Sequence, residues 1–270
     1  MKKDREKKTG RHTFVVCAYK RSEYLEVCVQ SVLRQTVQSK VVMCTSTPNN
    51  HIETIAKKYK LELYIREGIS DIRDDWNFAI SCADTPLVTI AHQDDIYHSR
   101  YVESMLGAFE ARPDATIFFS GYRPIKKKNI SLDANCIIRA VLRVPMRVDK
   151  FASMKFFKSL IFSLGNSVCC PTVTYARERI EEPVFTSLYK YNIDWDTFRK
   201  LAKISGSFAY DPHALVGYRI HDGSTSKEYI NNAGRFHEDM QMFTEIWGET
   251  IARIIMKIYI KAYDTYKELK

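Results

Sequence analysis

The alternation of short apolar runs with amphipathic stretches constrains the fold of this chain more than any other feature. Residues 14–18 form an uninterrupted apolar run, which is typical of a strand buried on both faces of a parallel sheet. Residues 41–44 and 87–91 repeat the pattern. Between these runs, apolar residues recur at helical spacing, as in the stripe of Leu25, Cys28, Val29, Val32 and Leu33. The alternation predicts an α/β protein with a mostly parallel, doubly wound, Rossmann-like sheet.

The rest of the chain continues this alternation less regularly. Further strands are expected at residues 61–65, 116–119, 173–175, 208–210 and 214–218, and further helices at 52–59, 74–83, 101–110, 151–164, 195–204 and from about 230 to the end. Residues 47–50 predict a turn that starts the helix at 52–59. We therefore expect a basic tail at 1–12, one large domain at 13–227 and a helical C-terminal appendage at 228–270.

Composition and charge limit the classes of partner. The 270 residues include 41 Lys and Arg against 32 Asp and Glu, a net charge of +9. This excess favours nucleotide phosphates, nucleic acid or an acidic membrane face. No basic-aromatic motif of nucleic-acid-binding proteins is present, so nucleic acid is not expected. The seven cysteines show no metal-binding spacing and mostly lie in apolar runs, as reduced core residues do.

The N-terminal sequence bears on localisation. Residues 1–11 are charged and lack the apolar core of a signal peptide. No window approaches the roughly 20 uninterrupted apolar residues of a transmembrane helix. The sequence therefore predicts a cytoplasmic protein.

The strongest chemical signal is a pair of carboxylates in His92-Gln93-Asp94-Asp95, directly after the strand expected at 87–91. Open α/β sheets bind ligands at the carboxyl ends of their strands, because loops and helix N-termini meet there. Two adjacent carboxylates repel each other, and their hard oxygen atoms suit Mg²⁺ or Mn²⁺ together with substrate phosphates. In the alternative interpretation, Asp95 only caps the helix that follows.

Several segments, taken in order along the chain, resemble a known family. They are Val15-Val16-Cys17-Ala18-Tyr19-Lys20-Arg21, Ser31-Val32-Leu33-Arg34-Gln35-Thr36, His92-Gln93-Asp94-Asp95, Asp194-Trp195-Asp196, Tyr218-Arg219-Ile220-His221 and Gly223-Ser224-Thr225-Ser226. Their order and spacing resemble the family 2 glycosyltransferases, which have the GT-A fold, over residues 13–227. In this resemblance the carboxylate pair takes the place of the acidic DXD metal motif, and residues from about 123 to 167 form the acceptor side.

The resemblance implies a nucleotide-diphosphate sugar donor bound at the strand ends. Tyr19 and Arg21 would contact the base and the diphosphate. Thr45 and Ser46 would lie beside the base or ribose, and Asn77 would face the nucleotide.

The same resemblance implies a metal cofactor, Mg²⁺ or Mn²⁺. Asp94 would coordinate the ion through the donor diphosphate, and Asp95 would assist or hold the loop. His92 would hydrogen-bond the nucleotide or shape the loop, and Gln93 beside it would also contact the nucleotide. His221 would approach the same ion or the diphosphate, unless it is only a structural loop histidine.

Asp194 is the carboxylate that we expect to act as general base. An acceptor hydroxyl becomes a good nucleophile only as its proton is removed. Asp194 stands at the start of the apolar stripe of the helix expected at 195–204, where it could instead be a simple N-cap, and Asp196 is a competing carboxylate. A single displacement would invert the anomeric configuration, as family 2 members do. We therefore expect an inverting, metal-dependent, hexosyl-type transferase that acts on a glycan or lipid-linked glycan in bacterial cell-surface polysaccharide biosynthesis.

Three departures from the family pattern weaken the donor assignment. Met43-Cys44-Thr45 stands where the family often has an acidic pair, so these residues offer no carboxylate to recognise a uridine nucleotide. His92-Gln93 leaves the metal motif with two carboxylates, and Ile193 replaces the acidic residue that often precedes the base. These changes indicate a subgroup with its own donor preference.

The C-terminal helix has two interpretations. Ile251, Ile254, Ile255, Ile258, Tyr259 and Ala262 form one apolar stripe, with Arg253, Lys257, Lys261, Lys267 and Lys270 alongside. The helix could pack on the large domain or on a partner subunit of a homodimer. Alternatively it lies on an anionic membrane, which would place the protein at the inner face of the plasma membrane.

Two other classes of function fit the same pattern less well. A non-catalytic module that binds a sugar nucleotide or glycan would not need Asp94, Asp95 and Asp194. A nucleotidyltransferase would carry a glycine-rich loop after the first strand, and residues 17–22 contain no glycine.

Overall fold

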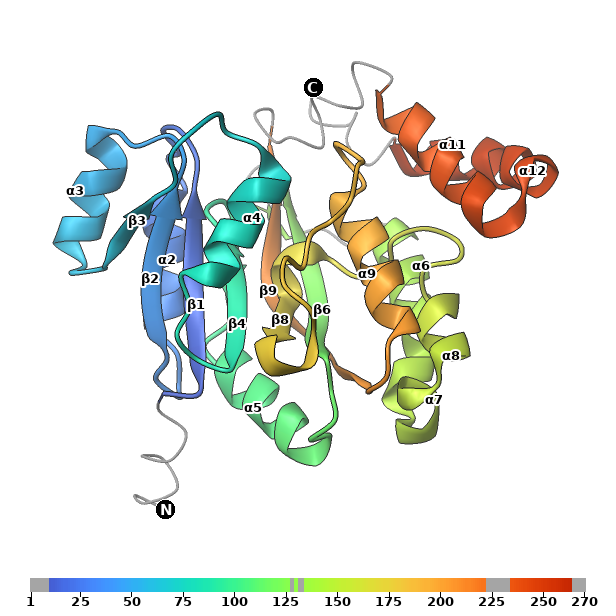
Figure 1. The fold of residues 1–270 in the computed structure, drawn as a ribbon, viewed down its shortest axis with the longest axis horizontal. Helices are drawn as coiled ribbons and strands as arrows, with labels where there is room; N and C mark the ends of the chain where they lie inside the picture. The colour runs from blue at the N-terminus through green and yellow to red at the C-terminus, as the bar shows by residue number, and fades with distance from the viewer. Residues whose placement is uncertain (1–9, 127–128, 131–133, 222–233, 264–270) are drawn as a thin grey trace. The chain divides into compact units, whose positions relative to one another are not determined.

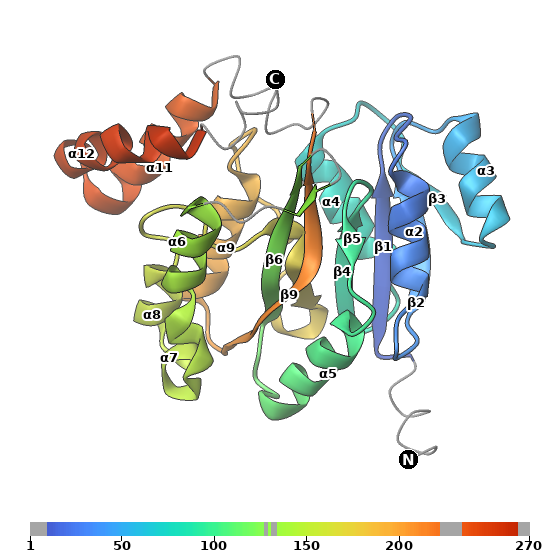
Figure 2. The same ribbon diagram turned by 180° about the vertical axis from the view of Figure 1, so that it is seen from behind.

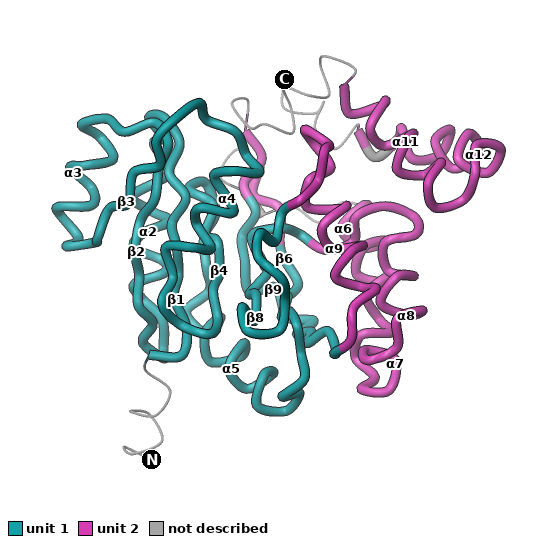
Figure 3. Tube along the Cα trace, viewed as in Figure 1, with its two compact units in different colours: residues 1–122, 169–185, 206–218 teal, residues 123–168, 186–205, 219–270 magenta. Residues whose placement is uncertain are grey.

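The computed structural model describes residues 10–126, 129–130, 134–221 and 234–263 (Figure 1). Most of the expected basic tail at 1–12 and the whole segment Gly223-Ser224-Thr225-Ser226 lie outside the described residues. The chain forms two compact units (Figure 3). Unit 1 comprises residues 1–122, 169–185 and 206–218, and unit 2 comprises 123–168, 186–205 and 219–270. Each unit is therefore assembled from segments that are distant in sequence.

The strands form one mixed sheet. Its order is β3-β2-β1-β4-β8-β6-β9-β5, with β7 paired to β6. The strands are β1 (His12–Ala18), β2 (Lys40–Thr45), β3 (Leu63–Ile65), β4 (Leu87–His92), β5 (Ile96–Tyr97), β6 (Ile117–Lys126), β7 (Asn129–Ile130), β8 (Val173–Ala176) and β9 (Phe208–Ile220). β1 pairs in parallel with β2 and β4, and β2 pairs in parallel with β3. β8 joins β4 and β6 in antiparallel pairs, and β5 joins β9 likewise.

Helices cover both faces of the parallel strands of unit 1. They are α2 (Leu25–Leu33), α3 (Asn50–Lys58), α4 (Ile72–Ser81) and α5 (Tyr101–Ala111). Opposite views place α4 in front of β4 in one and α2 in front of β1 in the other (Figures 1 and 2). Asn49 caps α3 as the turn at 47–50 predicted, with its Oδ1 accepting from the amides of His51 and Ile52 at 3.0 and 3.2 Å. The predicted α/β fold class is confirmed.

The apolar runs of unit 1 form strands whose side chains are buried. Phe14, Val15 and Val16 of β1 are fully buried. The Phe14 ring contacts that of Tyr97 edge to face, with 5.1 Å between centroids. A strand enclosed on both faces leaves no polar position, which is the pattern that residues 14–18 display.

Unit 2 is mostly helical. Its elements are β7, α6 (Ala134–Leu142), η1 (Val144–Arg147), α7 (Asp149–Ser153), α8 (Lys155–Leu160), α9 (Ile193–Lys203), α11 (Gly234–Trp247), α12 (Glu249–Tyr259) and η4 (Ile260–Tyr263). The fully buried Trp195 of α9 lies in its core. The Trp195 indole donates to the Phe162 carbonyl at 3.1 Å and meets the Phe243 ring at 5.2 Å.

Two predicted elements were wrong in their extent. The helix expected at 151–164 is broken, because Met154 adopts an extended conformation between α7 and α8. The two strands expected at 208–210 and 214–218 are one strand, β9, which continues through Pro212. Hydrophobic periodicity shows neither difference. Apolar residues continue on both sides of Met154, where the helix is broken, and polar residues interrupt the apolar pattern near Pro212, where the strand is continuous.

The C-terminal helix α12 also differs from its prediction. Its buried residues are Ala252 and Met256, whereas Ile251, Ile254 and Ile258 are 47%, 59% and 70% exposed. The stripe inferred from the sequence therefore mixes a packed side with an exposed one. The predicted basic flank of this stripe includes Lys267 and Lys270, which lie outside the described residues.

Gly121 of β6 provides a test of the sheet. A Cβ atom at this position would lie 2.5 Å from the carbonyl oxygen of Pro212 and 2.9 Å from that of His213 in β9. Backbone atoms of a paired strand cannot move aside easily, so Gly121→Ala should destabilise the protein by about 2–4 kcal/mol. Urea denaturation measures this change.

The matched control is Gly107→Ala within α5, where nothing lies within 4 Å of the added carbon. This substitution should leave stability unchanged or raise it by up to about 1 kcal/mol, because alanine favours helix. A Gly121→Ala protein as stable as the wild type would contradict the pairing of β6 with β9.

Candidate active site

The carboxyl ends of three parallel strands meet at one edge of unit 1. Cys17 of β1 stands in register with Cys44 of β2 on one side and with His92 of β4 on the other. Ala18 at the end of β1 is level with Thr45 at the end of β2. The loops that follow these strands therefore begin side by side, as ligand-binding loops of open α/β sheets do.

The loop after β1 is tied to the loops after β2 and β4. The Tyr19 amide donates to Gln93 Oε1, and Gln93 Nε2 donates to the Tyr19 carbonyl, both at 2.9 Å. The Lys20 amide donates to Thr47 Oγ1 at 2.7 Å. Lys20 has a φ of 52°, a conformation that a non-glycine residue adopts at a cost and only when its surroundings hold it. Gln93 and Thr47 thus fix the backbone of the first loop.

Asp94 is half-buried at the end of β4, where its Oδ1 accepts a hydrogen bond from Ser22 Oγ at 2.8 Å. Asp95 is only 2% exposed, and both carboxylates help to raise the pKa of the Cys28 thiol, after the larger effect of burial. The alternative that Asp95 caps the next helix is wrong, because α5 begins at Tyr101 and its N-cap residue is Arg100. Of the two carboxylates, Asp94 is therefore the more exposed.

His92 precedes this pair as a neutral imidazole. Its ring stacks on Trp76 of α4 with 5.2 Å between centroids, and burial lowers its pKa to about 4. Its Nε2 is buried and has no hydrogen-bond partner among the described residues. A neutral ring shapes the site and does not attract phosphate by charge.

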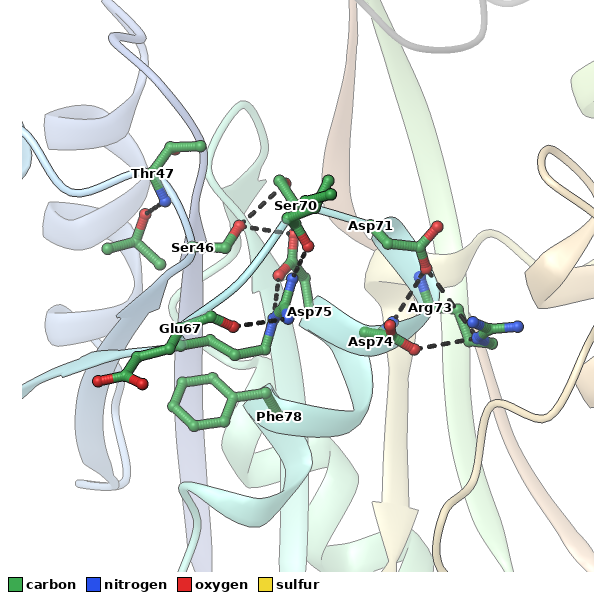
Figure 4. A network of polar contacts seen from close by, with 12 residues as sticks. Ser46, Thr47, Glu67, Ser70, Asp71, Arg73, Asp74, Asp75 and Phe78 are labelled. Atoms are coloured by element: carbon green, nitrogen blue, oxygen red, sulfur yellow. Dashed lines mark hydrogen bonds and ion pairs between the residues drawn. The ribbon is translucent and has the colours of Figure 1, made fainter.

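The polar groups after β2 form a network (Figure 4). Thr45 is buried, and its hydroxyl accepts from the Thr47 amide at 3.0 Å. The Ser46 and Ser70 hydroxyls lie 2.9 and 2.8 Å from Asp75 Oδ2. The Ser46 side chain is therefore held by hydrogen bonds to Ser70 and Asp75.

Asp75 is the residue of this network that the sequence analysis missed. Arg66 Nε donates to its Oδ1 at 2.7 Å, and the two side chains are 16% and 14% exposed. The sequence shows no acidic pair after β2, but α4 brings the Asp75 carboxylate to that strand end. In the sequence, Asp74-Asp75 are indistinguishable from ordinary first-turn residues of a helix, which favours acids.

The other two residues predicted in unit 1 differ in exposure and bonding. Arg21 is exposed in the loop after β1. The Asn77 side chain holds the backbone of Phe185, since its Nδ2 donates to the Phe185 carbonyl at 2.8 Å and its Oδ1 accepts from the Phe185 amide at 2.9 Å. This bracing accounts for Asn77 without a ligand.

In unit 2, Asp194 is a half-buried carboxylate in the first turn of α9. Burial raises its pKa to about 6, against the opposing effects of the Trp195 amide and of the positive charge on Arg139. Asn166 Nδ2 donates to its Oδ2 at 2.8 Å. Asp194 is not the N-cap, a position taken by Asn192, and the competing Asp196 is engaged by Lys200 Nζ at 2.8 Å.

Residues of α11 hold the start of α9. Glu238 accepts from three successive backbone amides, those of residues 190, 191 and 192, at 2.8–2.9 Å. Asn192 Nδ2 also donates to Asp239 Oδ1 at 2.8 Å. The position of Asp194 therefore depends on a carboxylate from the C-terminal segment, which no local sequence signal indicates.

His221 is half-buried in unit 2, directly after β9. The nine other residues predicted for the donor and metal sites belong to unit 1, and those at the ends of β1, β2 and β4 are brought together there.

The donor set suits a divalent ion that is shared with a substrate. Among the described residues, no group of three or more His, Cys, Asp or Glu is arranged to hold a metal on its own. Mg²⁺ commonly takes one or two protein carboxylates and completes its shell with water and substrate phosphates. Asp94, with one oxygen on Ser22 and its carboxylate half-buried at a strand end, fits that pattern.

The fold is that of one class of α/β transferase, the GT-A glycosyltransferases. A family model described as "Glycosyl transferase family 2" matches residues 13–181. The chain belongs to this family and is a glycosyltransferase. A protein of Haemophilus influenzae described as "Uncharacterized glycosyltransferase" is 21% identical over 253 residues, covering 91% of this chain and 75% of that protein.

Solved structures share the fold. The mannosyltransferase PcManGT from Pyrobaculum calidifontis, in complex with GDP-Man and Mn²⁺, has a TM-score of 0.62 at 14% identity over 94% of this chain and 75% of that one. TarS residues 1–349 of S. aureus, in complex with UDP-GlcNAc, has a TM-score of 0.59 at 13% identity over 95% and 73%. Glucosyl-3-phosphoglycerate synthase from Mycobacterium tuberculosis, with Mn²⁺ and UDP-Glc, has a TM-score of 0.51 at 14% identity over 83% and 75%. The predicted family is confirmed.

The raised pKa of Asp194 predicts a pH-dependent gain in stability for Asp194→Asn. The pKa of this group in the unfolded chain is 3.8, so the folded state binds the proton more tightly. The resulting contribution to stability is present below about pH 4 and is lost as pH rises to about 6. Asp194→Asn should therefore raise the free energy of unfolding at neutral pH by about 1–2 kcal/mol and change it little near pH 4. Urea denaturation at both pH values measures the difference.

Asp149→Asn, on the exposed surface of α7, is the matched control and should change the free energy of unfolding by no more than about 0.5 kcal/mol, as surface substitutions usually do. If Asp194→Asn were equally destabilising at both pH values, the carboxylate would be a structural group and not an acid whose ionisation costs stability.

Proposed function

We propose that this glycosyltransferase uses a nucleotide-diphosphate sugar and binds it at the carboxyl ends of β1, β2 and β4. The observation that carries the proposal is the half-buried Asp94 carboxylate, held by Ser22 beside the ends of β1 and β2. The GDP-Man, UDP-GlcNAc and UDP-Glc complexes of proteins with the same fold support this class of donor. Tyr19 is 44% exposed, and its ring could contact the nucleotide while the nearby Arg21 supplies positive charge.

Asp94 would hold Mg²⁺ or Mn²⁺ through the donor diphosphate, and the neighbours solved with Mn²⁺ support this cofactor. When bound, the ion stabilises the negative charge that develops on the departing nucleoside diphosphate. Asp95, buried behind it, keeps the loop in place and adds negative charge. In this proposal, His221 is a secondary candidate for the same ion or diphosphate.

Asp194 acts as the general base in the proposed reaction. Its pKa of about 6 leaves the carboxylate ionised at neutral pH, yet close enough to working pH to accept a proton effectively. The acceptor hydroxyl loses its proton to Asp194 while its oxygen attacks the anomeric carbon. The bond to the diphosphate breaks on the opposite side of that carbon, so the anomeric configuration inverts. No enzyme nucleophile takes part.

The nucleotide base would be read by Ser46 and the network behind it. Asp75 supplies the carboxylate that the loop after β2 lacks, and Arg66 neutralises it. Thr45 is buried and bonded to the Thr47 amide, which fits a role in shaping this loop.

The acceptor we propose is a glycan or a lipid-linked glycan of the bacterial cell surface, and the sugar is a hexose. Exposed apolar side chains of unit 2 favour an acceptor with a lipid part, because such an acceptor is presented at a membrane surface. Among the described residues, no helix is long and apolar enough to cross a membrane.

The direct test is release of nucleoside diphosphate from a panel of UDP- and GDP-sugars with Mn²⁺, Mg²⁺ or chelator. One donor should be turned over only with metal, and Asp94→Asn should lower the rate by about a hundredfold or more, because charge stabilisation at the leaving group is lost. The control is Glu53→Gln on the exposed side of α3, which should keep the wild-type rate.

Turnover of the same donor by Asp94→Asn at the wild-type rate would contradict the proposal. Binding of a sugar nucleotide without turnover of any donor or acceptor would favour the non-catalytic module instead. Unchanged melting temperatures in both variants ensure that the rates report on chemistry.

A further inference from the structure

The positive charge of this protein is concentrated in one stretch of unit 2. Residues 123–168 contain ten Lys and Arg against two Asp, whereas the whole chain has an excess of nine. The segment therefore accounts for nearly all of the net charge. Nothing in the proposed donor site uses it, because Asp94, Ser46 and Tyr19 belong to unit 1.

The same stretch exposes apolar side chains at helical spacing. On α6, Ile137, Ile138 and Val141 are 57%, 55% and 64% exposed. They lie at positions i, i+1 and i+4, so they share one side of the helix. A helix of a folded unit normally buries such a side, and an exposed apolar side of this kind indicates an interaction surface.

A second exposed apolar set follows on α8 and the turn after it. Phe156 is 68% exposed, and Leu160 and Leu164 are 37% and 48% exposed. The spacing of four residues brings Phe156 and Leu160 to one side of α8. The short helix η1 contacts α6, α7 and α8, so these elements form one local group. Both views of the ribbon show α6, α7 and α8 next to one another (Figures 1 and 2).

Basic side chains accompany the apolar ones. Arg147, Lys150 and Lys155 are exposed between the two apolar sets, and Asp149 is the only acid among residues 134–168. We call these exposed residues of 137–164 the α6–α8 surface. A surface that mixes large apolar side chains with lysine and arginine suits the interface of an anionic lipid bilayer. The apolar side chains insert among the lipid tails, and the basic side chains bind the anionic headgroups.

We propose that the α6–α8 surface docks the protein onto an anionic lipid membrane. The inference is independent of the donor and the base, since it rests on no residue of either. It places the acceptor-side segment, and not the C-terminal helix, at the lipid.

Two comparisons favour lipid over other occupants and over other surfaces. In an isologous contact with a second copy, this basic surface would face the same basic surface, and like charges at an interface oppose association. The exposed isoleucines of α12 lack the charge excess, because Arg253 is paired with Glu249 at 2.5 Å and residues 234–263 carry four acids against four basic residues.

The experiment is co-sedimentation of the full chain with vesicles of phosphatidylcholine alone or mixed with phosphatidylglycerol, at low and physiological salt. Two α6–α8 variants are compared with the wild type, one with Val141→Gln, Phe156→Gln and Leu160→Gln, the other with Arg147→Gln, Lys150→Gln and Lys155→Gln. The α12 control carries Ile251→Gln, Ile254→Gln and Ile258→Gln. The charge control carries Lys57→Gln, Lys60→Gln and Lys203→Gln, three exposed lysines elsewhere in the chain.

Wild-type protein should bind only the vesicles that contain phosphatidylglycerol, more weakly as salt rises. The variant without the three basic residues should bind on the order of a hundred times more weakly, because each basic residue near such a surface contributes about 1 kcal/mol. The variant without the three apolar side chains should bind at least about tenfold more weakly, because it inserts less apolar area into the bilayer. Both controls should bind like the wild type. All substituted side chains are exposed, and circular dichroism with melting temperature confirms folding.

Three results would overturn the proposal. They are absence of wild-type binding to either vesicle, equal binding by the α6–α8 variants, and loss of binding in the α12 control alone. Sedimentation velocity adds a fourth, since a wild-type dimer that the Phe156 variant abolishes without any vesicle binding would assign the surface to a second copy.

Discussion

The parallel register of β1 with β2 and β4 is the constraint on which the candidate site depends. It sets Cys17 level with Cys44 and His92, so the three following loops start at one edge of the sheet. Backbone and side-chain hydrogen bonds then tie the loops together through Gln93 and Thr47. Because a shift of register by one residue would turn each strand's side chains to the opposite face, the buried residues of β1 hold the site in place as well as the core.

Hydrophobic periodicity identified the strands of the sheet and most helices, because these features are local in sequence. It could not identify Asp75, which reaches the end of β2 only through the packing of α4, or Glu238, which holds the start of α9 from a distant helix. It also misjudged α12, since isoleucines on the exposed and packed sides of a helix look alike in a sequence. Predictions failed where tertiary contacts decide the role of a residue.

The two units divide the tasks of the proposed enzyme. Unit 1 contains the residues assigned to the donor, and its sequence carries 19 Lys and Arg against 20 Asp and Glu. Unit 2 contains Asp194, the proposed base, and the basic, apolar α6–α8 surface. Asp194 is half-buried with a raised pKa, and the charged group Glu238 fixes its helix, a combination typical of sites that give up stability for function.

The central claim is that Asp94 and a donor diphosphate share one divalent ion. Electron paramagnetic resonance of Mn²⁺ tests it directly, because coupling to phosphorus nuclei reports an ion bound to a phosphate. The account predicts that bound Mn²⁺ with phosphorus coupling appears when UDP or GDP is added to the wild-type protein and disappears in Asp94→Asn. Mn²⁺ that binds the protein equally well without nucleotide, or that shows the same coupling in Asp94→Asn, would contradict it.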